Sequence, residues 1–191
     1  MKLTGTEQQK QMKRQNSNRE NSNRENSNRD DGRCGYLLLI GYGNSLRRDD
    51  GGGVAMAQRL AHYCWCSRGL PVRLLTVTQL GPELAADLAA EDIIAAVFVD
   101  SAARDGPGPV QVERITSSAL SPSLGHQLAP AALLVYAELL YGRCPRAWLV
   151  TVPGTDYSHG EGFSPRVEQL LTHTAAVADR LLAEIEGTSY A

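Results

Sequence analysis

The chain has 191 residues, 42% hydrophobic and 21% charged, with a net charge of −2 at pH 7, as expected for one globular domain of ordinary size with some additional residues. The part after residue 33 holds 11 basic and 16 acidic side chains, a balance that argues against a nucleic-acid-binding surface. No apolar run approaches the roughly 20 residues that a membrane helix needs, so we expect neither a nucleic-acid nor a membrane partner.

Residues 1–33 differ in composition from the rest. Residues 16–30 are three copies of one pentamer, NSNRE, NSNRE and NSNRD. The copies contain no apolar residue, so they bury no surface that would offset the entropy of ordering. We predict a disordered tail over residues 1–33 and a single α/β domain over residues 34–191. The repeats are either a functional tail or a passive insertion of repeated coding sequence.

Two features bear on the cellular compartment. The first residues lack the apolar segment of a signal peptide. The four cysteines, Cys34, Cys64, Cys66 and Cys144, form no C-x-x-C pair, and we interpret them as reduced structural thiols. Both features predict a cytoplasmic protein.

Strands and helices are expected to alternate along the domain. Short apolar runs predict strands, whereas apolar residues at helical spacing, with proline or serine at the start, predict helices. The expected strands are Tyr36–Gly41, Val72–Val77, Ile93–Val99, Val110–Ile115 (an edge strand or ribbon) and Ala147–Val152. The expected helices run from about Asp50 to Ser67, from Pro82 to Ala90, from Pro130 to about Tyr141, and onward from Ser164, which caps the last helix. This alternation predicts a three-layer α/β fold, a twisted and mostly parallel sheet of about five strands with helices on both faces.

Two adjacent acids, Asp49 and Asp50, stand where the first strand, a glycine-rich turn and the first helix meet. An acid at a helix start accepts backbone N–H bonds and opposes the helix dipole. Two acids do not both cap one helix, so one of them is free. Asp100 follows the third expected strand. Packing gives no reason for an acid there, because burying an unpaired carboxylate is costly. Asp100 therefore has either a functional role or the role of a cap on the next turn.

His126 lies shortly before the helix expected at Pro130. Asp50, Asp100 and His126 thus occupy three element ends. Two carboxylates and one imidazole suit a divalent metal such as nickel or zinc, with coordination positions left open. Their spacing matches no local metal motif. We interpret His159, in the loop before Ser164, as a loop residue.

Other catalytic motifs are missing from the sequence. It has no G-x-S-x-G elbow of the α/β-hydrolases. The glycine-rich turn is not G-x-G-x-x-G, and no lysine follows residue 33, so a phosphate-binding G-x-x-x-x-G-K-[ST] loop is absent. A dinucleotide or nucleoside triphosphate site is therefore not expected.

Residues 41–53, GYGNSLRRDDGGG, resemble the G-x-G-N-x-L-x-x-D-[DE]-G-x-G signature of the hydrogenase maturation endopeptidases. Members of this family trim the C-terminus of the large subunit of [NiFe] hydrogenases. The similarity continues through Gln79–Leu84, Val99–Ala102, His126–Leu128 and Gly162–Pro165, and covers about residues 36–186. The stretch Gln79–Leu84 is most similar to the branch that serves bidirectional, NAD-linked hydrogenases.

The resemblance implies roles for particular residues. Asp50, Asp100 and His126 would be the catalytic and metal-binding residues, and Asp49, Gly41, Gly43 and Asn44 would contact substrate or support the site. The implied enzyme is an aspartyl-type or metal-dependent endopeptidase that removes a C-terminal peptide from the nickel-loaded precursor of the large subunit. The nickel would be supplied by that precursor, with zinc or another divalent ion as the alternative in the isolated protein. Attack by metal-activated water and attack assisted by a carboxylate base both stay open.

Two positions depart from the family pattern. Asp50 stands where relatives often have glutamate, and is one methylene shorter. Gly52 stands where a small or apolar residue is usual, so three consecutive glycines, Gly51 to Gly53, should loosen the start of the first helix. Two alternatives to the protease also stay open: a non-catalytic, chaperone-like paralogue that binds the large subunit, and an unrelated small-molecule hydrolase on the same fold.

Deletion of residues 1–33 is expected to leave folding and activity intact, because the repeats have no apolar side chain with which to pack. The measurement is a thermal melt of the full and shortened chains, followed by an activity assay. A melting temperature lower by more than a few degrees in the shortened chain would show that the tail packs on the domain.

Overall fold

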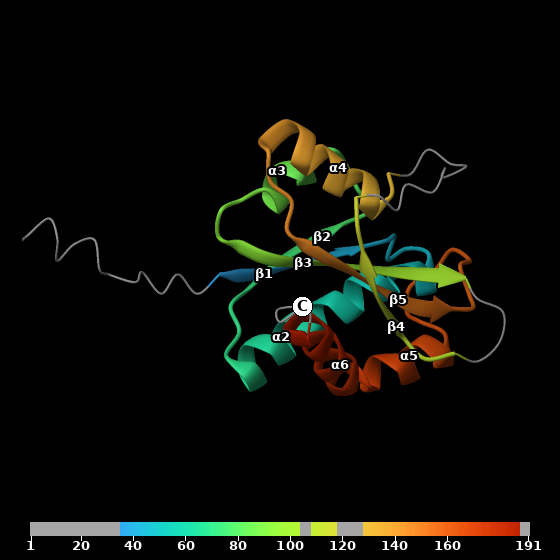
Figure 1. Ribbon diagram of the computed structural model, residues 1–191. Helices are drawn as coiled ribbons and strands as arrows, with labels where there is room; N and C mark the ends of the chain where they lie inside the picture. Colours follow the sequence, from blue (N-terminus) through green and yellow to red (C-terminus); the bar gives the residue numbers. More distant parts are fainter. Residues whose placement is uncertain (1–34, 104–107, 118–127, 188–191) are drawn as a thin grey trace, which may run out of the picture. The chain divides into compact units, whose positions relative to one another are not determined.

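The computed structural model describes residues 35–103, 108–117 and 128–187 (Figure 1). The tail predicted for residues 1–33 and the predicted ligand His126 lie outside the described residues. The elements, in chain order, are β1 (Tyr36–Tyr42), η1 (Arg48–Gly51), α2 (Gly52–Arg68), β2 (Val72–Val77), α3 (Leu84–Leu88), β3 (Ile93–Ala103), β4 (Gln111–Ile115), α4 (Pro130–Tyr141), β5 (Arg146–Gly154), α5 (Pro165–Thr172) and α6 (Thr174–Gly187).

The five strands form one sheet in the order β2-β1-β3-β5-β4. β1 pairs in parallel with β2 and β3, and β3 pairs in parallel with β5. Only β4 runs antiparallel, against β5 at the edge of the sheet. The predicted α/β class, the mostly parallel sheet and the edge position of β4 are confirmed.

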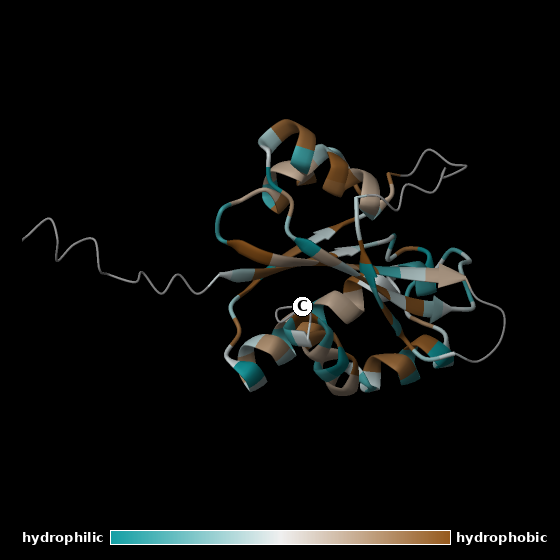
Figure 2. Ribbon diagram, viewed as in Figure 1, coloured by the Kyte–Doolittle hydropathy of each residue, from teal (hydrophilic) through white to brown (hydrophobic). Residues whose placement is uncertain are grey.

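Helices cover both faces of this sheet (Figure 1), as the two hydrophobic clusters show. One cluster joins the sheet to α2, α5 and α6, and contains Val97 and Val99 of β3. The other joins it to α3 and α4, and contains Ala96 and Phe98. Figure 2 shows hydrophobic stretches along the central strands. Because β3 is buried on both faces, its sequence is a continuous apolar run rather than an alternating one.

Several predicted boundaries shift. β3 was expected to end before Asp100 but continues to Ala103, because β5 runs beside it as far as Gly154 and supplies ladder partners. The first helix begins at Gly52 rather than Asp50, since a 3₁₀ turn over Arg48–Gly51 precedes it. The short helix is confined to Leu84–Leu88.

The last helix is not continuous. α5 ends at Thr172 and α6 begins at Thr174. The Thr174 hydroxyl donates to the Leu171 carbonyl at 2.7 Å, and His173 N–H donates to the Leu170 carbonyl at 3.0 Å. These three-residue bonds replace the regular helical pattern at the junction. The predicted start is confirmed, because Ser164 caps α5 and its hydroxyl accepts a bond from Val167 N–H at 3.4 Å.

The N-terminus of α2 packs closely against the ends of β1 and β3. A Cβ on Gly53 would lie 2.7 Å from the Val99 carbonyl oxygen, 2.8 Å from Asp100 Cα and 2.8 Å from the Tyr42 carbonyl oxygen. Only glycine fits there without moving backbone. In the described part of the chain, no helix is long and apolar enough to cross a membrane.

Two neighbouring glycines therefore form a matched pair for mutation. Gly53→Ala is expected to destabilise the fold by about 1–3 kcal/mol, the usual cost of overpacking. Gly52→Ala is expected to stay within about 1 kcal/mol of the parent, because alanine favours helix and its Cβ would meet side-chain atoms rather than backbone: Val167 Cγ1 at 3.3 Å, and Ser101 Cβ and Oγ at 3.7 Å. Urea unfolding of both variants provides the measurement. Equal losses would contradict the close approach at Gly53.

Candidate functional site

Asp50 and Asp100 line one pocket of about 110 Å³ where β1 and β3 approach their carboxyl ends. The described lining consists of Tyr42, Gly43, Asp50, Thr78, Gln79, Leu80, Asp100, Ser101 and Leu128. Ligands of open α/β sheets bind at this end of the strands. The structure thus brings together two of the three predicted metal ligands. The third, His126, lies outside the described residues, two positions before Leu128.

The glycine-rich turn shapes the surroundings of Asp50. Asn44 N–H donates to Asp50 Oδ2 at 3.0 Å, and Asn44 Oδ1 accepts a bond from Leu46 N–H at 3.0 Å. Gly43 has φ +136°, and a Cβ there would lie 1.9 Å from the Asp50 carbonyl oxygen. Gly41 instead provides contact between elements, because its Cβ would lie 2.6 Å from Ala57 Cβ on α2. Gly43 and Asn44 therefore hold Asp50 at the pocket, whereas Gly41 brings α2 against β1.

Asp100 is a partly buried carboxylate with few compensating partners. Burial raises its pKa to about 6, and the charge of Asp50 adds to the rise. The bond from Ser101 N–H to Asp100 Oδ1, at 2.7 Å, and a hydrogen bond from the Tyr42 phenol act in the opposite direction. Burial, and then the charge of Asp100, also raise the pKa of Tyr42, so the phenol keeps its proton. Asp100 is thus poised to exchange a proton near neutral pH.

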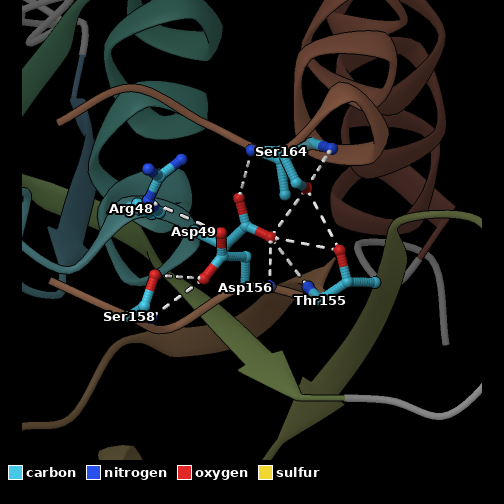
Figure 3. A network of polar contacts seen from close by, with 7 residues as sticks. Arg48, Asp49, Thr155, Asp156, Ser158 and Ser164 are labelled. Carbon is cyan, nitrogen blue, oxygen red and sulfur yellow. Dashed lines mark hydrogen bonds and ion pairs between the residues drawn. The ribbon is translucent and has the colours of Figure 1, made fainter. Parts of the chain in front are cut away.

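Asp49, next to Asp50, is fully buried, is not part of the pocket lining, and is surrounded by polar groups of other segments (Figure 3). Ser164 donates its N–H to Oδ1 and its hydroxyl to Oδ2, both at 2.7 Å. Thr155 N–H and Asp156 N–H donate to Oδ2 at 2.7 and 2.9 Å. Burial by itself would raise the pKa of Asp49, but these bonds from Ser164, Thr155 and Asp156 outweigh it and lower the pKa. Asp49 is therefore a charged structural centre beside the pocket.

Further bonds connect the same two segments. Asp49 N–H donates to the Asp156 carbonyl at 3.0 Å, and Arg48 N–H donates to the Gly160 carbonyl at 3.1 Å. Arg48 Nε also lies 3.5 Å from Asp156 Oδ2, and Arg48 has φ 45°, which is uncommon for a residue other than glycine. The turn that carries Asp50 is thus bound along its length to the loop after β5. His159, in that loop, is exposed.

A pair of hydroxyl groups, from Ser101 and Tyr157, lies near the pocket. Ser101 Oγ is 3.0 Å from the Tyr157 hydroxyl. A Cβ on Gly154 would lie 2.4 Å from that hydroxyl and 2.9 Å from Ser101 Oγ, so Gly154 provides the space in which they meet. Burial raises the pKa of Tyr157, so its hydroxyl stays protonated, and either hydroxyl of the pair can be the donor.

The sequence interpretation did not assign functional roles to four polar lining residues, Tyr42, Thr78, Gln79 and Ser101. Tyr42 lies between two glycines of the turn signature, and Ser101 follows Asp100. Thr78 and Gln79 directly follow β2. The sequence signal that could have identified them as site residues is their position at or just after the ends of apolar runs, because the ends of parallel strands come together at one edge of the sheet.

The described residues contain no group of three His, Cys, Asp or Glu side chains placed to hold a metal ion. The pocket supplies a pair of carboxylates, from Asp50 and Asp100. Carboxylate oxygens bind divalent ions, and two such ligands leave coordination positions open for other groups. The described part of the site can therefore contribute ligands to a metal that arrives with ligands of its own.

Solved structures share this fold. A [NiFe] hydrogenase maturation protease HycI from Thermococcus kodakarensis KOD1 is similar over 76% of this chain and 92% of its own, with 19% identity and a TM-score of 0.58. The hydrogenase maturating endopeptidase HybD from E. coli is similar over 80% of this chain and 93% of its own, with 23% identity and a TM-score of 0.57. A hydrogenase 2 maturation peptidase from a Thaumarchaeota archaeon has 25% identity and a TM-score of 0.50 over 80% of this chain and 98% of its own.

Comparison with models of protein families gave no match. Comparison with curated proteins likewise found no relative. The resemblance to hydrogenase maturation endopeptidases is confirmed by the solved structures at the level of the fold. The similarity to the NAD-linked branch stays a prediction.

Asp49→Asn is expected to destabilise the protein at pH 7 by about 1.5–3 kcal/mol, the usual contribution of hydrogen bonds to a charged group. Because the folded-state pKa of Asp49 is lowered, the stabilisation is present in full above the unfolded-state pKa of about 3.9. It is lost as the pH falls through the folded-state pKa, so parent and variant should converge in acid. Urea unfolding at pH 7 and pH 3 provides the measurement.

Asp179→Asn is the matched control for this prediction. Asp179 also has a lowered pKa, but it is exposed and paired with Arg68 at the surface, where an ion pair contributes little. Its substitution should have a much smaller effect at pH 7. Equal effects of the two substitutions would contradict the structural role of Asp49.

Proposed function

We propose that this protein is an endopeptidase that removes a C-terminal peptide from the nickel-loaded precursor of a [NiFe] hydrogenase large subunit. The observation that carries the proposal is the pocket in which Asp50, from the signature turn, meets Asp100, from β3. The fold shared with three maturation proteases and peptidases supports it. The proposal includes processing in the cytoplasm, as predicted from the sequence.

The proposal assigns the nickel to the substrate. Asp50 and Asp100 would bind the nickel that the precursor already carries, and His126 would provide a third ligand. A set of two carboxylates and one imidazole leaves coordination positions free, as a site must if the metal keeps ligands from the precursor. Binding of this kind would recognise a precursor that contains its metal and would place the scissile bond beside the pocket.

Peptide hydrolysis requires activation of water. The carboxyl group of Asp100, with a pKa raised to about 6 by burial, suits a general base near neutral pH. Activation of water by the precursor's nickel is the alternative route. Both routes use the same pocket and need an ionised Asp100, either as the base or as a ligand.

The direct experiment incubates the purified protein with nickel-loaded and with nickel-free precursor. Mass spectrometry should show loss of a C-terminal peptide from the nickel-loaded precursor alone. Binding of the precursor without cleavage would favour a chaperone-like paralogue instead. Cleavage of both forms would contradict recognition of the metal.

Asp50→Asn, Asp100→Asn and His126→Ala are each expected to abolish processing. Asp100→Asn should not destabilise the fold. The raised pKa of Asp100 means that ionisation of its carboxyl group destabilises the folded state relative to the unfolded state. That penalty is absent below the unfolded-state pKa of about 3.9, grows between the two pKa values and is complete above about 6. Asp100→Asn should therefore gain less stability at pH 5, where the penalty is only partly present, than at pH 8, where the variant should be neutral to about 1–3 kcal/mol more stable.

Thermal melts at both pH values, together with the processing assay, test this pair of expectations. If Asp100 served only as a cap, its loss should cost about 0.5–2 kcal/mol and spare activity. A destabilised but active Asp100→Asn would therefore contradict the proposed role of Asp100.

A further inference from the structure

Tyr42 and Asp100 occupy neighbouring positions on adjacent strands. β1 and β3 are parallel, and their register pairs Ile40 with Phe98 and Gly41 with Val99, which places the next two residues, Tyr42 and Asp100, side by side. Side chains alternate along a strand. Ile40 and Phe98 point into the cluster under α3 and α4, so Tyr42 and Asp100, two positions further on, lie on that same face. Both residues also line the pocket.

Two donor groups act on the Asp100 carboxylate from different strands. Ser101 N–H of β3 donates to Oδ1 at 2.7 Å, and the Tyr42 phenol of β1 lies close enough to the carboxylate for each group to shift the pKa of the other. An ionised carboxylate has about four lone-pair positions, so these two contacts restrict its rotation and leave acceptor positions for a ligand in the pocket. The orientation of Asp100 thus depends on both strands.

Packing accounts for the ring of Tyr42 but not for its hydroxyl. The ring packs against the cluster formed with α3 and α4, where phenylalanine would fill the same space. The hydroxyl lies at the polar end, with Asp100 as its partner. Tyr42 is partly buried, and a tyrosine hydroxyl withdrawn from water usually has a polar partner; here that partner is a residue of the candidate site.

We propose that Tyr42 is a positioning residue, whose phenol holds the Asp100 carboxylate in the orientation that binds the nickel of the precursor. Tyr42 acts through Asp100 and does not itself contact the substrate. The inference rests on the proposed function and adds a residue to its machinery. Hydrogen-bond partners of this kind, which orient a metal ligand, typically change metal affinity or activity by about 10–100-fold when removed.

The test compares Tyr42→Phe with the parent chain. With nickel-loaded precursor, kcat/KM should fall by about 10–100-fold. With nickel-free precursor, which is not processed, the equilibrium Kd should stay within about twofold of the parent, because the variant alters only how Asp100 meets the metal. The melting temperature should change by a few degrees at most, since the ring is retained.

Tyr63→Phe is the matched control. It removes a hydroxyl bonded to Asp179 at 3.1 Å on the surface between α2 and α6, away from the pocket lining, and should leave kcat/KM unchanged. Full activity of Tyr42→Phe would overturn the inference. A weaker Kd for nickel-free precursor, matching the loss in kcat/KM, would overturn it as well, because Tyr42 would then contact the polypeptide directly.

The same experiment separates this inference from the proposed function. If the parent processes nickel-loaded precursor and Asp100→Asn does not, the proposed function stands whatever Tyr42→Phe does. Full activity of Tyr42→Phe would then remove the positioning role alone. A parent that leaves nickel-loaded precursor intact would overturn both.

Discussion

A buried negative charge at Asp49 organises the region around the site. A carboxylate without exposed surface is tolerated only when donors replace water, and here Ser164, Thr155 and Asp156 supply four of them. Those donors come from the loop after β5 and from the start of α5. The hydrogen bonds that stabilise the Asp49 carboxylate therefore also fix the position of the turn that carries Asp50.

Asp49 and Asp50 in the turn before α2, and Asp100 on β3, are three carboxylates with different environments. Asp49 is held ionised by its donors, whereas burial makes Asp100 resist ionisation. Asp50 lines the pocket together with Asp100, with a single described backbone donor from Asn44. Differences in burial and in hydrogen-bond donors give acids of one site different pKa values, and so allow them different roles. The stable charge supports the structure, and the less stable one is available for binding or catalysis.

Much of the fold could be predicted from local patterns. The strand Val72–Val77, the helix Pro130–Tyr141 and the Ser164 cap follow from apolar runs and from proline and serine chemistry, and the structure has them at those positions. The extension of β3 past Asp100 could not be predicted, because it depends on pairing with β5. The pairing of Tyr42 with Asp100, and the enclosure of Asp49, likewise depend on strand register and on contacts between distant segments. Local propensity carries no information about either.

The bonds to Asp49 join residues that are 106 to 115 positions apart in the chain. Closing loops of that length costs entropy before any contact compensates for it, and contacts between distant residues slow folding. The turn that carries Asp50 therefore gains these bonds only when the loop after β5 and the start of α5 are in place. A partly folded chain, even one with a formed β1–α2 unit, therefore lacks the bonds that hold this turn, and the pocket is complete only together with the domain.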